Sequence, residues 1–275
     1  MATFSPSDAA LEGFQLVRRH WRLIVGWSLF NVVALVALAV ALVVVLIGIS
    51  PFAGSRGAAE VWGAILGGLI VGLGSAAVEF VIYCGLLRVE LAPDAPAFLH
   101  LRMGRDEVRV FAASLLLAVL ALPPLAVAVV ATRAAAGASI LAAVGVGLVA
   151  FLAFYALLLR FALMPVIAFH ERRISVAESW RRTRGQTWRL LGMSLLLLCL
   201  MLLMAVVIWI AVFVVSGFLT GFGDRDLHGA EAFSAHPGRY LFQTGVQLLL
   251  APVWIVIGQA PWVAVYRALS PDAAT

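Results

Sequence analysis

The sequence predicts an all-α polytopic membrane protein with about six transmembrane helices, arranged as three pseudo-repeated helical hairpins with cytoplasmic interfacial amphipathic helices. Of its 275 residues, 64% are hydrophobic and only 12% are charged, and the mean hydropathy is +1.07. This composition is typical of a chain surrounded by lipid. The chain also holds six apolar runs that reach the roughly 20 residues a helix needs to cross about 30 Å of hydrocarbon.

The six predicted spans follow one another along the chain. They cover residues 23–49, 61–87, 110–131, 140–159, 190–218 and 241–265. The third contains Pro123 and Pro124, and the sixth contains Pro252 and Pro261. A spanning helix tolerates proline where neighbouring groups bond the carbonyls that proline leaves free, so we expect kinks at these positions.

The basic residues predict the orientation of these spans. All 19 of them are arginine, and 15 lie in segments that share a side of the membrane with the N-terminus. The other four are Arg56, Arg133, Arg225 and Arg239. Because cytoplasmic segments carry the excess of positive charge, both termini are expected in the cytoplasm.

A repeated unit organises the single membrane domain that we expect over residues 1–275. Each even-numbered span ends with a tyrosine and then an arginine, and a proline follows. These endings are Tyr83 to Arg88, Tyr155 to Arg160 and Tyr266-Arg267. Similar charged segments precede the odd-numbered spans. The pattern predicts pseudo-repeats at about residues 8–93, 94–165 and 166–271.

The charged segments have the spacing of amphipathic helices. Apolar residues recur at helical intervals in the first and third of them: Leu11, Phe14, Val17, Trp21 and Ile24, and Ile174, Ala177, Trp180, Trp188 and Leu191. A helix with one apolar and one arginine-rich face lies in the membrane plane with its cations toward anionic headgroups. The candidate lipid contacts are Arg181, Arg182, Arg184 and Arg189, with Trp180 and Trp188 at the interface. The alternative is that these arginines only set the topology.

The third charged segment also carries a resemblance to a known group of proteins. Its residues Glu171, Ala177, Ser179, Trp180, Thr183, Arg184, Gly185, Trp188, Arg189 and Gly192 form a pattern that resembles the membrane domain attached to some bacterial glycerophosphoryl diester phosphodiesterases, and related uncharacterised bacterial membrane proteins. The resemblance implies a six-span helical domain in a bacterial inner membrane. In those enzymes the phosphodiesterase activity belongs to a separate soluble barrel, for which the spans leave no room here, so we expect no such activity.

Glu79 is the informative ionisable residue inside a predicted span. It lies about nine residues before Arg88, or roughly 13 Å from the interface at helical rise. Gly68, Gly72, Ser75 and Glu79 share a helix face of small residues, which predicts that Glu79 points into the bundle. It is either a protonated acid bonded to a neighbour such as Asn31 or Gln247, or a proton or substrate site.

Catalytic motifs do not appear in the sequence. It holds no metalloprotease, serine-hydrolase, nucleotide-binding or zinc-cysteine pattern. One loop collects Asp224, Asp226, His228, Glu231 and His236, but their spacing matches no established metal site, and a solvated loop is the simpler interpretation.

Three function classes therefore stay open. The first is a non-catalytic module that organises lipids or a partner protein, the second a transporter of small molecules or lipids that uses Glu79, and the third a membrane enzyme. We expect no cofactor or metal and no nucleic acid as a partner. The expected partners are membrane lipids, chiefly anionic ones, together with a protein partner or a second copy of the chain.

Overall fold

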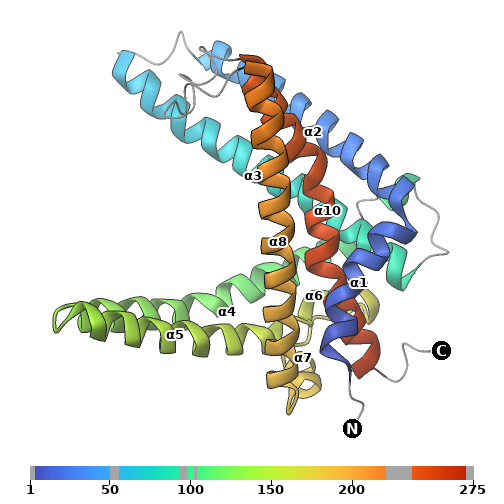
Figure 1. Ribbon diagram of the computed structural model, residues 1–275, viewed down its shortest axis with the longest axis vertical. Helices are drawn as coiled ribbons and strands as arrows, with labels where there is room; N and C mark the ends of the chain where they lie inside the picture. Colours follow the sequence, from blue (N-terminus) through green and yellow to red (C-terminus); the bar gives the residue numbers. More distant parts are fainter. Residues whose placement is uncertain (1–3, 50–55, 93–97, 102–103, 221–236, 271–275) are drawn as a thin grey trace. The chain divides into compact units, whose positions relative to one another are not determined.

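A computed structural model describes residues 4–49, 56–92, 98–101, 104–220 and 237–270. These residues form helices and no strand (Figure 1). Six of the helices are long and apolar enough to cross a membrane, which confirms the predicted fold class and makes this a multi-pass membrane protein. The chain divides into two compact units, and several of the long helices contribute a part to each.

One unit comprises residues 16–83 and 199–257. It contains α2 (Trp21–Ile49), most of α3 (Arg56–Leu91), and parts of α8 (Thr187–Thr220) and α10 (Pro237–Leu269). Gly74 of α3 lies so close to Leu38 of α2 that a Cβ at Gly74 would come within 2.7 Å of both terminal methyl groups of that leucine. Small residues allow such close approach between spanning helices.

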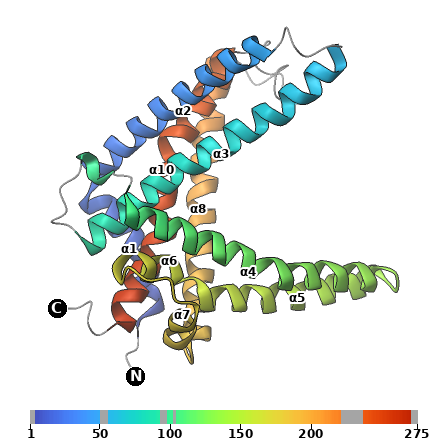
Figure 2. The ribbon, with the colours of Figure 1, turned by 180° about the vertical axis from the view of Figure 1, so that it is seen from behind.

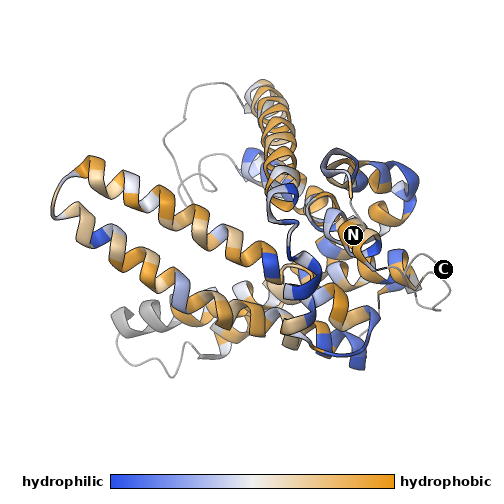
Figure 3. Cartoon of the chain, turned by 90° about the horizontal axis from the view of Figure 1, so that it is seen from below, coloured by the Kyte–Doolittle hydropathy of each residue, from blue (hydrophilic) through white to orange (hydrophobic). Residues whose placement is uncertain are grey.

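The other unit comprises residues 1–15, 84–198 and 258–275, described to the extent given above. It includes most of α1 (Pro6–Arg19) and an antiparallel hairpin of α4 (Arg105–Ala136) and α5 (Ile140–Phe161), seen from behind in Figure 2. Ser139 begins α5, because its side chain accepts a hydrogen bond from the backbone N–H of Ala142 at 3.1 Å. The hairpin is apolar along most of its length (Figure 3), as a lipid-facing element must be.

Two short helices follow this hairpin. They are α6 (Met164–His170) and α7 (Val176–Thr183). Met164 and Ala168 of α6 pack with Ala113 of α4 in a core that Val176 joins from α7. The sequence pattern did not predict α6, because an apolar stretch that follows a span and is only one to two turns long has no spanning signal of its own.

The predicted amphipathic helices form only in part. The first corresponds to α1, which ends at Arg19, so Trp21 and Ile24 of the predicted face belong to α2 instead. In the second charged segment the described residues before α4 form a single turn, η2 (Phe98–His100). The third is interrupted after α7, since Arg184 is extended and Gly185 has a φ of 81°. Trp180 and Trp188 therefore belong to different helices, α7 and α8, and the prediction of one continuous face through both is wrong. The predicted pseudo-repeats stay a prediction.

Candidate functional site

The helix α7 begins at a well-formed cap. Ser175 is extended, and its hydroxyl accepts a hydrogen bond from the backbone N–H of Glu178 at 3.2 Å. This bond satisfies one of the N–H groups that the first turn of a helix leaves without a partner. At its other end α7 stops because Gly185 takes a positive φ, which glycine adopts at little cost.

Side chains of α7 attach it to the end of α5. The hydroxyl of Ser179 donates to the backbone carbonyl of Arg160 at 2.8 Å, and that of Thr183 donates to the same carbonyl at 3.1 Å. This carbonyl belongs to the last turn of α5, where helix carbonyls lack their own donors. The Arg160 guanidinium lies 4.4 Å from the centre of the Trp180 ring, which makes a cation–π contact.

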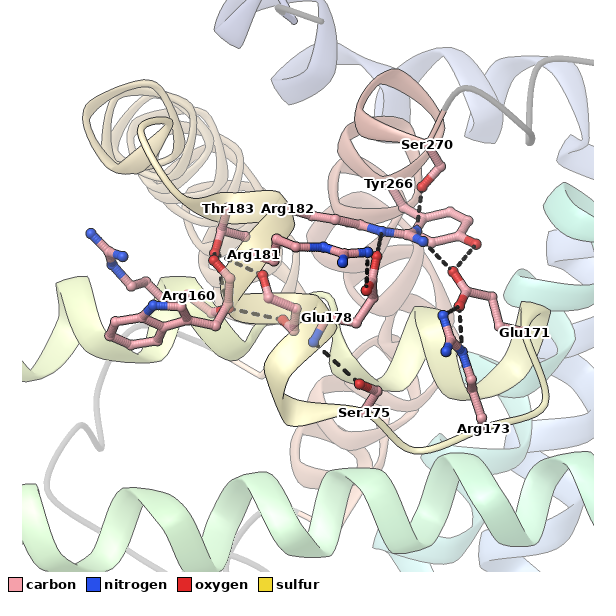
Figure 4. A network of polar contacts seen from close by, with 12 residues as sticks. Arg160, Glu171, Arg173, Ser175, Glu178, Arg181, Arg182, Thr183, Tyr266 and Ser270 are labelled. Carbon is pink, nitrogen blue, oxygen red and sulfur yellow. Dashed lines mark hydrogen bonds and ion pairs between the residues drawn. The ribbon is translucent and has the colours of Figure 1, made fainter. Parts of the chain in front are cut away.

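The centre of the site is Arg182, which joins α7 to two other segments (Figure 4). Its guanidinium contacts Glu178 of its own helix and Glu171 of the connection after α6, each at 2.6 Å. It also donates to the hydroxyl of Ser270 and lies 5.3 Å from the centre of the Tyr266 ring, both in or next to the end of α10. Tyr266 in turn donates to Glu171 at 3.2 Å. We call these five residues the Arg182 cluster.

The Arg182 cluster is closed to most of the solvent. The side chains of Arg182 and Glu171 are each 17% exposed, and that of Glu178 is 8% exposed. Burial alone would raise the pKa of the Glu178 carboxyl, but hydrogen bonds from Arg182 and Arg181 outweigh it and the pKa is lowered. Burial likewise opposes ionisation of Glu171, yet hydrogen bonds from Arg173 and Arg182 and the charge of Arg182 lower its pKa. Both carboxylates are therefore held in the charged form.

The remaining cations and aromatic rings of this region face outward. Arg184, Trp188 and Arg189 are exposed, with 83% of Trp188 accessible. No ion pair joins Arg184 or Arg189 to another described residue. Trp188 and Arg189 belong to the first turn of α8, which opens where the carbonyl of Gln186 accepts from the N–H of Leu190 at 2.9 Å. We call Arg184, Trp188 and Arg189 the arginine–tryptophan surface.

The six candidate lipid residues thus form two groups. Three of them are the arginine–tryptophan surface, and the other three contact residues of α5 or α7. Arg182 lies inside the cluster, and Trp180 is partly covered by Arg160 and Phe161. The guanidinium of Arg181 contacts Glu178 but is 76% exposed. Helical periodicity alone does not distinguish these residues, because it does not show which arginines contact a carboxylate. The spacing of Glu178 to Arg181 and Arg182, at three and four residues along one helix, was the available signal.

No hydrogen bond in the described structure joins the four residues of the predicted intramembrane site to one another. Asn31 is fully buried and donates to the backbone carbonyl of Leu248, while Ser75 donates to that of Gly72. Glu79 and Gln247 are exposed. A Cβ at Gly68 or Gly72 would meet nothing within 4 Å, so this face of α3 is open rather than packed. The prediction that Glu79 points into the bundle differs from the structure, in which Glu79 lies on an exposed face of α3. Its expected partner Asn31 donates to α10 instead.

The acidic and histidine loop, with its five candidate residues, lies outside the described residues. Within the described part of the chain, no group of His, Cys, Asp or Glu side chains is arranged to hold a metal ion.

A family model matches the second half of the chain. Residues 130–270 fit the model of a family of unknown function (DUF7544), so the match covers just over half of the chain. It includes the Arg182 cluster and the arginine–tryptophan surface. No curated protein and no solved structure matches the chain.

Proposed function

Because the chain belongs to this family of unknown function, whose description assigns no activity, we propose a function from the region that the family match covers. The protein is a non-catalytic multi-pass membrane module that binds anionic phospholipid headgroups through the arginine–tryptophan surface. The observation that carries the proposal is that Arg184 and Arg189 are exposed and without a carboxylate partner in the described structure, beside an exposed Trp188, at the start of a membrane-spanning helix.

The position of these residues suits a headgroup. Tryptophan prefers the level of the headgroups, and arginine just outside the hydrocarbon pairs with lipid phosphates. The first turn of α8 adds backbone N–H groups and the positive end of the helix dipole, which favour an anion. The Arg182 cluster supports the surface indirectly, because Glu171 and Glu178 are occupied by Arg182 and do not neutralise Arg184 or Arg189.

The proposal also covers the side of the membrane on which this surface lies and the resemblance to other membrane domains. By the arginine distribution, both termini and the arginine–tryptophan surface face the cytoplasm of a bacterial cell, where the inner leaflet supplies anionic lipid. The resemblance to the membrane domains attached to glycerophosphoryl diester phosphodiesterases fits a module that works beside lipid headgroups. A protein partner or a second copy of the chain is compatible with the same surface.

The two other function classes have less support. A transporter that uses Glu79 would need this carboxyl to meet a polar path, and in the described residues Glu79 makes no hydrogen bond or ion pair. The enzyme class is supported only by the acidic and histidine loop of the sequence.

Native mass spectrometry tests the proposal. The purified protein is offered phosphatidylglycerol and phosphatidylethanolamine together, and the bound lipids are counted. Each arginine near an anionic surface contributes about 1 kcal/mol, so Arg184→Gln with Arg189→Gln should weaken phosphatidylglycerol binding by about thirtyfold at low salt. Binding of phosphatidylethanolamine should change little.

The control removes an exposed arginine of another region. Arg133, near the end of α4, is exposed and forms no ion pair in the described structure, so Arg133→Gln changes the net charge as much as Arg184→Gln alone does. Arg184→Gln should weaken phosphatidylglycerol binding by about fivefold, whereas Arg133→Gln should retain most of it. Equal losses in these two single variants would show that only net charge matters and would refute a specific surface.

A further inference from the structure

Helix α10 contains a backbone carbonyl that its own helix cannot bond. In an α-helix the N–H of each residue donates to the carbonyl four residues earlier, but Pro252 has no N–H. The carbonyl of Leu248 therefore loses its partner in the middle of a membrane-spanning helix. An unpaired carbonyl is expensive in hydrocarbon, so a group from outside the helix must bond it.

Helix α2 supplies that group. The side-chain amide of Asn31 donates to the carbonyl of Leu248 at 2.7 Å. Ser28, on the same face of α2, donates to the next carbonyl, that of Leu249, at 2.7 Å. Asn31 is fully buried and Ser28 is 7% exposed, so both bonds lie inside the packed contact of α2 with α10. Ser28 and Asn31, the polar side chains of the apolar run that follows Arg22 in α2, are thus directed at the proline break.

Only one of the two polar atoms of the Asn31 side chain has a hydrogen-bond partner in the described structure. The amide nitrogen is used, but the amide oxygen is buried and has no hydrogen-bond partner in the described structure. A buried acceptor without a donor destabilises the state that contains it. The closed arrangement therefore satisfies the Leu248 carbonyl while it leaves the Asn31 oxygen unsatisfied. A rearrangement that admits a water molecule or another donor would satisfy both groups.

We propose that residues 248–252 of α10 form a hinge and that Asn31 is the latch that holds it closed. In the latched state Asn31 bonds Leu248 and α10 is continuous. In the released state α10 bends at Pro252, and water or another donor reaches the Asn31 amide and the Leu248 carbonyl together. This conformational device belongs to α2 and α10 alone, and it does not depend on lipid binding at the arginine–tryptophan surface.

The pairing of Asn31 with Pro252 can be tested by a double-mutant cycle. Pro252→Ala restores the missing N–H, so Leu248 regains a donor within its own helix and no longer needs Asn31. Hydrogen–deuterium exchange of α10 is measured in the wild type, Asn31→Leu, Pro252→Ala and the double variant, all in nanodiscs. Losing one hydrogen bond of ordinary net strength should speed exchange just after Pro252 by about fivefold in Asn31→Leu. In the Pro252→Ala background the same replacement should have less than half of this effect.

Two further variants keep the test decisive. Thr132→Val is the control, because Thr132 donates to the carbonyl of Ala128 at 2.8 Å within α4, away from Pro252. It should change hydrogen–deuterium exchange in α4 equally with and without Pro252→Ala. If Asn31→Leu does not fold, Ser28→Ala replaces it, and faster exchange near Pro252 is again expected. The latch is refuted if Asn31→Leu lowers thermal stability with no local change in exchange, or if its effect on exchange is equal in both backgrounds.

Discussion

Replacement of Arg182 by methionine tests the Arg182 cluster most severely. Methionine keeps much of the length of the side chain but removes the guanidinium, so Glu171 and Glu178 lose the cation that each contacts at 2.6 Å. Ser270 loses its donor, and the Tyr266 ring loses the cation above it. The variant thus leaves two carboxylates side by side, mostly buried and no longer balanced by Arg182.

The size of the effect follows from this burial. Removing one partner of a buried ion pair costs about 3–5 kcal/mol, because the other charge stays buried. Arg181 and Arg173 still contact Glu178 and Glu171, but their side chains are 76% and 60% exposed, and exposed pairs contribute little. We therefore take the lower end, about 3 kcal/mol, which corresponds to a fall of about 6–12 °C in the melting temperature of a chain of this size.

Thermal unfolding in detergent measures this fall. The matched control is Arg184→Met, two residues along the chain, which removes an exposed arginine without a carboxylate partner in the described structure and should change the unfolding free energy by less than about 0.5 kcal/mol. Equal melting temperatures for Arg182→Met and the wild type would refute the assignment of Arg182 as a structural residue. A larger fall for Arg184→Met would do the same.

Three other predictions concern single features of the structure. Ser175→Ala removes the cap of α7 and should cost about 1 kcal/mol, measured by thermal unfolding, whereas Ser175→Asp should retain most of the stability. Because the pKa values of Glu171 and Glu178 are lowered, their contribution is complete above the ordinary value of 4.5 and is lost as the pH falls below it. The wild type should lose melting temperature in that acid range by more than Arg182→Met does, and equal losses would contradict the linkage. Finally, Glu79 is exposed on α3, so Glu79→Gln and Glu79→Ala should leave thermal stability nearly unchanged. A proton-coupled flux in reconstituted vesicles that Glu79→Gln abolishes would favour the transporter class, and a marked loss of stability in Glu79→Ala would show that Glu79 has a partner.

The sequence predicted the spanning helices because their signals are local. Length and hydropathy within one run of residues decide whether a helix can cross a membrane, so all six were placed. The cap at Ser175 and the break at Gly185 were also readable in principle. Serine three residues before glutamate is a helix-start pattern, and glycine after a helix is a common stop.

The candidate site could be predicted only in part, because its decisive contacts are not local. Tyr266 donates to Glu171 across 95 positions of the chain, and Asn31 donates to Leu248 across 217. A helical pattern marks Arg182 and Arg184 as similar polar residues of one segment. Only the folded chain shows that Arg182 is enclosed by carboxylates while Arg184 stays exposed.

The central claim, lipid binding at the arginine–tryptophan surface, is tested most directly by quenching of Trp188 fluorescence. Trp188 is one of eight tryptophans, so its signal is taken as the difference between the wild type and Trp188→Phe in nanodiscs. The account predicts that bromine-labelled phosphatidylglycerol quenches this signal more than an equal share of bromine-labelled phosphatidylcholine does. The excess should disappear when Arg184 and Arg189 are both replaced by glutamine. Equal quenching by the two lipids, or an excess that survives the double replacement, would contradict the account.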